Sequence, residues 1–203
     1  MWIYFIAASV GLITLLMRLR KEPIPKENRH ENQPNKTIIG TPRIGFLNLM
    51  GHKAEQVLHE DKIAFGSLFT SSEESEQAPP ICDVLLIYCF IDQDGYIRGT
   101  TDGLRDIIRR SGARIAIVAS ENSTESYIAA GKDTVYGRAN LVMTLQRNGT
   151  AFSTFFRKLF ILMMRGTPMP LAWVELAPQI PRQTHKNDPG LICSMEAGHI
   201  VFK

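Results

Sequence analysis

CDVLLIYC, at residues 82–89, is the stretch of sequence that decides the predicted fold. The apolar run Val84–Phe90 is continuous rather than alternating, which is typical of a strand that a parallel sheet buries on both faces. A helix is predicted after it, over Asp102–Ser111, because the apolar residues there recur at helical spacing. Ile115–Val118 then predicts the next strand. A strand, a helix and a strand in this order indicate a parallel crossover.

The rest of the chain continues this alternation of strands and helices. Thr101 is the predicted N-cap of the helix described above, and Gly112 is its predicted end. The other predicted elements are, in chain order, strands at Ile44–Leu49 and Ile63–Phe69, a flexible loop at Ser71–Pro80, a helix at Glu121–Ala130, a weaker strand at Leu141–Leu145, helices at Phe152–Arg165 and Met169–Leu176, and a closing strand or hairpin with Ile192 and Ile200–Phe202. This pattern predicts an α/β fold, a three-layer sandwich around a mostly parallel sheet.

The composition is that of a globular protein and excludes several classes of function. Of 203 residues, 44% are hydrophobic and 21% are charged, and the net charge is only +3. Such a small charge predicts no nucleic-acid partner. The three cysteines, Cys82, Cys89 and Cys193, have neither disulfide-framework nor metal-ligand spacing, so we expect free thiols, no metal and a reducing compartment. The chain has no glycine-rich phosphate-binding motif, so we expect no cofactor.

The N-terminal segment predicts a membrane anchor. Met1–Met17 carries no charged side chain and would span about 26 Å as a helix, near the lower limit for a bilayer. Basic residues follow at once, which predicts a single-pass anchor over residues 1–21 with the domain on the cytoplasmic side of the membrane. Residues 22–40 are polar and contain prolines, so we expect a flexible linker, with one α/β domain over 41–203.

A cysteine and a histidine follow two of the predicted strands. Cys89 ends the 84–90 strand, and His52 follows the strand Ile44–Leu49. In parallel α/β sheets, chemistry gathers at the carboxyl ends of strands, so both side chains are expected at one edge. An imidazole beside a thiol can generate the thiolate, which is the nucleophile. The structural alternatives are an inert core cysteine and a surface-loop histidine.

Three acidic residues in carboxyl-end loops are candidate substrate-binding groups. Asp92 and Asp94 follow the cysteine, and Glu121 follows the strand at 115–118. Together they could form an acidic pocket that favours a basic substrate side chain. The alternatives are a plain turn for the two aspartates and helix capping for the segment around Glu121.

The order of these features resembles the CHAT peptidase-like domains, bacterial relatives of the caspases. The segment Asp83–Cys89 is similar to the strand that carries their nucleophile, and Gly103–Val118, with Ser-Gly-Ala-Arg at 111–114, is similar to their helix and following strand. Phe155–Gly166 resembles their Phe-rich helix, and Pro189–Phe202 occupies the place of their final strand. The resemblance covers residues 44–202. It implies a caspase-like fold with Cys89 as nucleophile and His52 as base.

The sequence therefore leads to two main hypotheses. The first is a membrane-anchored cysteine peptidase, in which the thiolate attacks a peptide carbonyl, the imidazole transfers the proton and a backbone N–H stabilises the oxyanion. The second is an inactive caspase-like scaffold or sensor that binds a protein partner at the membrane. It is favoured by the bulky Phe90 and Ile91 beside Cys89, and by Gly51-His52, which reverses the His-Gly order of the family. A flavodoxin-like ligand binder is the least favoured alternative, because the chain lacks a phosphate loop.

Overall fold

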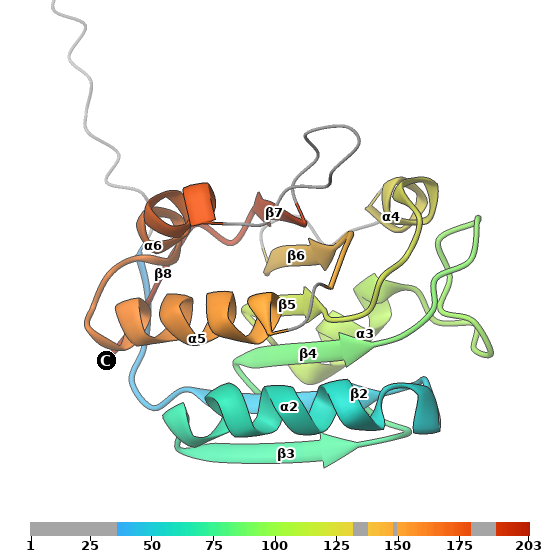
Figure 1. The fold of residues 1–203 in the computed structure, drawn as a ribbon, viewed down its shortest axis with the longest axis horizontal. Helices are drawn as coiled ribbons and strands as arrows, with labels where there is room; N and C mark the ends of the chain where they lie inside the picture. The colour runs from blue at the N-terminus through green and yellow to red at the C-terminus, as the bar shows by residue number, and fades with distance from the viewer. Residues whose placement is uncertain (1–35, 132–137, 148–149, 180–189) are drawn as a thin grey trace, which may run out of the picture. The chain divides into compact units, whose positions relative to one another are not determined.

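A six-stranded sheet organises the computed structural model, which describes residues 36–131, 138–147, 150–179 and 190–203 (Figure 1). The strand order is β3-β2-β4-β5-β6-β7. The strands are β2 (Arg43–Asn48), β3 (Ser71–Ser75), β4 (Val84–Tyr88), β5 (Ile115–Val118), β6 (Asn140–Thr144) and β7 (Leu191–Met195). All pairs are parallel except β6 with β7, which is antiparallel. The predicted α/β fold with a mostly parallel sheet is confirmed.

The central strands form because their side chains are apolar on both sides of the sheet. Every residue of β4 is fully buried, and β5 is buried throughout. Val84, Leu86 and Tyr88 enter one core cluster, whereas Leu85 and Ile87 enter the other. Successive side chains of a strand point to opposite faces of the sheet. The continuous apolar run of β4 therefore contributes residues to both core clusters.

Helices cover both faces of the sheet (Figure 1). On one face lie α2 (Glu55–Phe65), α5 (Ala151–Met164) and α6 (Met169–Leu176), whose buried apolar residues belong to the first core cluster. On the other face lie α3 (Leu104–Ser111) and α4 (Thr124–Gly131), which belong to the second cluster. The layers are therefore helix, sheet and helix, as the alternating sequence pattern predicted.

The predicted start of α3 is wrong, but its predicted end is confirmed. Gly103, and not Thr101, is the N-cap. Residues 100–102 form a turn instead, because the Asp102 N–H donates to the hydroxyl of Thr100 at 3.1 Å. At the other end, Gly112 adopts φ 70°, a left-handed conformation that glycine reaches without a steric penalty.

Two other predictions between β2 and β4 are wrong. Ile63–Phe69 is not a strand, because α2 continues to Phe65 and a short 3-10 helix, η2 (Gly66–Leu68), follows. Leu58 and Phe65 are buried on one face of α2, so tertiary packing outweighs the β-branched Ile63, which is exposed. The segment predicted as a flexible loop from Ser71 contains β3, which is held by parallel pairing with β2.

A second, two-stranded sheet joins the two ends of the described chain. β1 (Lys36–Ile39) pairs in parallel with β8 (His199–Phe202). Lys36–Ile39, a described part of the predicted linker 22–40, therefore form a strand. β7 and β8 do not form a hairpin, because they belong to different sheets. Ile200 and Phe202 of β8 belong to the first core cluster.

The predicted membrane anchor, residues 1–21, lies outside the described residues. Within the described ranges, no helix has the length and apolar character needed to span a bilayer.

Candidate functional site

The carboxyl ends of β2 and β4 form the candidate site, because the chain leaves these neighbouring strands in opposite directions. From β2 it passes through α2 to β3, and from β4 it passes through α3 to β5 on the other side. Such a switch point is where open α/β sheets place their ligands. Asn48 pairs with Tyr88 in the ladder, so His52 and Cys89 follow adjacent strand ends, as predicted.

His52 points into solvent. It lies in a 3-10 turn, η1 (Gly51–Lys53), that the Asn48 side chain fixes by donating to the Gly51 carbonyl at 3.1 Å and accepting from the Met50 N–H at 3.1 Å. The His52 side chain is 96% exposed, and its Nδ1 lies 2.5 Å from Oε1 of Glu55. The ring therefore contacts little of the protein. Its hydrogen-bond partner is the carboxylate of Glu55, which also lies at the surface.

Cys89 is fully buried. Its backbone N–H donates to the Ser120 hydroxyl at 3.0 Å, and its carbonyl accepts from that hydroxyl at 2.6 Å and from the Asn122 amide at 3.1 Å. The side chain packs in the second core cluster, beside residues such as Ile91 and Ile97. Burial raises the pKa of the thiol to about 12, although the hydrogen bond with Ser120 lowers it.

The structure therefore does not bring the predicted dyad together. A ring that is almost wholly exposed cannot contact a sulfur that is 0% exposed, even though both follow adjacent strand ends. A nucleophilic cysteine needs a lowered pKa and access to substrate. Cys89 has a raised pKa in an apolar cluster, and these are the properties of a core cysteine. Burial also raises the pKa of Cys82 and of Cys193 to about 12.

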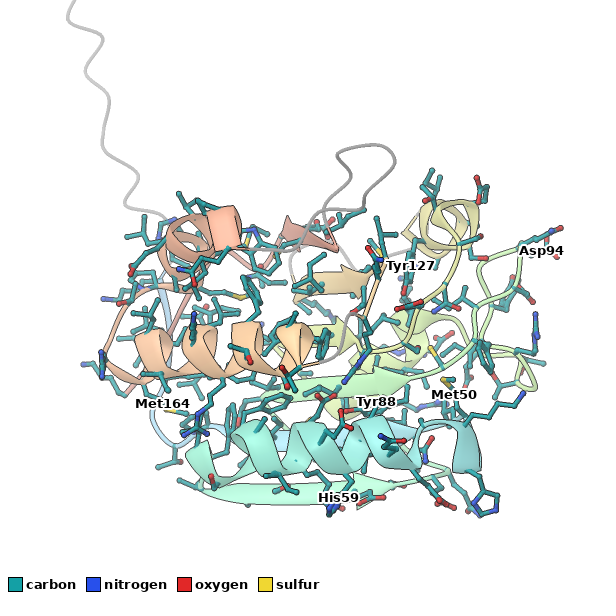
Figure 2. All side chains as sticks on the ribbon, viewed as in Figure 1. Met50, His59, Tyr88, Asp94, Tyr127 and Met164 are labelled. Atoms are coloured by element: carbon teal, nitrogen blue, oxygen red, sulfur yellow. The ribbon has the colours of Figure 1, made fainter. Side chains whose placement is uncertain are left out.

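The three predicted substrate-binding acids do not form a common pocket wall. Asp92 builds a turn, because its Oδ1 accepts from the backbone N–H groups of Asp94 at 3.0 Å and Tyr96 at 2.9 Å. Asp94 is exposed and points away from the sheet at the outer end of the loop after β4 (Figure 2). Asp94 lines a hollow of about 360 Å³ beside α3 and α4, and neither Asp92 nor Glu121 lines it. Glu121 instead accepts from the backbone N–H of Arg147.

A buried ion pair at this edge was missed by the sequence analysis. The guanidinium of Arg147 donates to both carboxylate oxygens of Asp61, at 2.9 and 3.0 Å, and the Tyr88 hydroxyl donates to Asp61 at 2.7 Å. Arg147 also donates to the Ala119 carbonyl at 3.0 Å and covers the Phe152 ring at 4.1 Å. Burial raises the pKa of Asp61, against the opposing effects of Arg147 and Tyr88. Because 86 positions separate the two charges, no local spacing could reveal the pair.

A second network fixes the loop after β5, where the predicted helix start at Glu121 is wrong because α4 begins at Thr124. Asn122 bridges this loop to the end of β4, since its Oδ1 accepts from the Ile91 N–H at 2.7 Å while its amide donates to Cys89. The Tyr127 hydroxyl lies 2.6 Å from the Ser120 carbonyl and 2.9 Å from the Thr144 carbonyl. Asn122 and Tyr127 thus hold the loop after β5 against the ends of β4 and β6.

Phe90 follows the end of β4 and is half-buried. The ammonium of Lys53 lies 5.4 Å from the Phe90 ring centroid, and the guanidinium carbon of Arg98 lies 5.7 Å from it. Such contacts stabilise an exposed site by about 0.5–1 kcal/mol each.

Neither the protein-family models nor the curated proteins give a significant match. Within the described residues, no group of three or more histidine, cysteine or acidic side chains could hold a metal ion.

Proposed function

We propose that the chain is a non-catalytic, caspase-like module that binds a protein partner, and that its predicted N-terminal anchor holds it at the cytoplasmic face of a membrane. The observation that carries the proposal is the burial of the Cys89 thiol. Burial raises the pKa of this thiol to about 12, so almost all of it stays protonated at pH 7. The nucleophilic thiolate is then too rare to support acyl transfer.

The networks around the thiol support the same conclusion. Ser120 and Asn122 use their side-chain groups to bind the backbone of Cys89 and Ile91, so these two side chains are directed at the protein and not at a substrate. On the α2 side of the sheet, the charges of Asp61 and Arg147 bind one another. An enzyme generally keeps its polar groups directed at a cavity, whereas here they are directed at the protein backbone and at one another.

The cysteine peptidase is the second candidate, because Asn48 pairs with Tyr88 and the two predicted catalytic residues follow neighbouring strand ends. Catalysis would require the loop after β4 to release Cys89 from its cluster and the His52 ring to leave Glu55. The two proposals differ in whether this rearrangement occurs in the native protein.

Peptidyl electrophiles distinguish the two candidates. The full-length chain is incubated with a mixture of peptidyl chloromethyl ketones that carry basic, acidic or apolar end residues, and adducts are located by mass spectrometry. We expect no adduct on Cys89 in the native protein and adducts on all three cysteines after unfolding in urea. An adduct on native Cys89 that disappears in His52→Ala would overturn the non-catalytic proposal in favour of the peptidase.

A further inference from the structure

The strand β3 forms one edge of the six-stranded sheet, and no other strand of the described chain lies beyond it. Ser71–Glu74 are exposed and Ser75 is half-buried, so the strand covers almost no core. Serine and glutamate are also poor strand formers. Pairing with β2 is therefore the main interaction that holds β3, and its outer side is open to a further strand.

The register shows which backbone groups face outward. The Leu49 N–H donates to the Tyr88 carbonyl at 2.8 Å, so odd-numbered residues of β2 direct their backbone groups to β4 and even-numbered residues direct theirs to β3. Ile44 is paired with Ser72. In a parallel ladder, this pairing directs the N–H and C=O groups of Ser71, Glu73 and Ser75 toward β2. The same groups of Ser72 and Glu74 face outward.

The charge of this edge selects the kind of strand that it can accept. Glu73, Glu74 and Glu76 lie along it or directly after it. Glu74 faces the α2 side and forms an ion pair with Lys62 at 2.6 Å. Glu73 faces the other side, and within the described ranges it has no cationic partner. A second copy of β3 would place like charges against one another, which disfavours self-pairing.

We propose that the outer edge of β3 binds an extended segment of a protein partner with lysine or arginine at alternate positions. Its backbone would pair with Ser72 and Glu74, and its cations would lie beside Glu73. This inference rests on the proposed partner-binding function and names the chemistry of the partner. Main-chain hydrogen bonds supply affinity in such strand addition, and the alternate side chains supply specificity.

The test uses two fluorescent peptides, one alternating valine with lysine and one alternating valine with glutamate, and measures binding to the full-length chain by fluorescence anisotropy. We expect the lysine peptide to bind at least tenfold more tightly than the glutamate peptide. Glu73→Lys should abolish this preference, whereas Glu125→Lys, the same charge change on the exposed surface of α4, should preserve it. Equal loss in both variants would show non-specific attraction and overturn the proposal.

Backbone pairing is tested separately. Ser72→Pro removes an outward N–H, whereas Glu73→Pro removes an N–H of the β2–β3 ladder and serves as the unfolding control. We expect Ser72→Pro to remain folded by circular dichroism and to bind the lysine peptide at least tenfold more weakly. If Ser72→Pro does not fold, the same loss is expected for the wild-type chain with a lysine peptide methylated on alternate backbone nitrogens.

Undiminished binding of the methylated peptide, or no binding of the lysine peptide at all, would overturn the edge-pairing proposal. Either result would leave the non-catalytic proposal standing, because that proposal fails only if native Cys89 forms the histidine-dependent adduct described above.

Discussion

Arg147 connects three parts of the carboxyl edge through one guanidinium. It binds Asp61 of α2, the carbonyl at the end of β5 and the face of Phe152 in α5. Its side chain is only 10% exposed, and that of Asp61 is fully buried. A charge in such a place is stable only while its partner is present, so each of these residues fixes the position of the other.

Removing one member of this pair should be costly. We expect Arg147→Met to lower the free energy of unfolding by about 3–5 kcal/mol, because it leaves the Asp61 carboxylate buried without its cation. The double variant Asp61→Leu with Arg147→Met should recover part of this loss. Urea unfolding measures both.

The exposed pair Asp106–Arg109 provides the matched control. Its side chains are 38% and 55% exposed, so Arg109→Met should change the free energy of unfolding by less than about 1 kcal/mol. An equal loss in Arg147→Met and Arg109→Met would mean that the buried pair does not stabilise the edge.

Gly95 determines how the loop after β4 packs on α4. It has φ 92°, and a Cβ there would lie 2.6 Å from the backbone nitrogen of Ala130. Gly99, in the same loop, has φ 86° and open space around it. The two glycines therefore share a left-handed conformation and differ in what surrounds them.

This difference gives a prediction at the scale of the element. Gly99→Ala should cost about 1–2 kcal/mol of unfolding free energy through conformation alone. Gly95→Ala should cost more, because the methyl group must also displace the backbone of α4. Thermal unfolding of the two variants compares them, and equal melting temperatures would show that the loop does not pack closely on α4.

The elements that the sequence predicted correctly are those whose apolar pattern is sufficient by itself. The bounds of β5 and α6 were predicted as observed, and the continuous run of β4 predicted its burial on both faces. The helix α2 was missed where Ile63 is exposed, and β3 was missed because its residues are polar. Both depend on neighbours that are distant in the sequence, so local propensity pointed to the wrong structure.

At the scale of the whole domain, the same limit separates the fold from the site. The sequence analysis placed His52 and Cys89 after neighbouring strands, and β2 does pair with β4. It could not show whether the two side chains face one another. Tertiary contacts decide this: Glu55 holds the imidazole at the surface, while Ser120 and Asn122 hold the Cys89 backbone so that its side chain lies in the core.

The pH dependence of alkylation at Cys89 tests the central claim most directly. The rate with iodoacetamide is measured by mass spectrometry on the native full-length chain and on His52→Ala. Because burial raises the pKa of the thiol from 9.0 to about 12, we predict a slow reaction that accelerates only as the pH approaches that range or the chain unfolds, with the same profile in both proteins. A fast reaction below pH 9 that His52→Ala slows would contradict the account and establish the dyad.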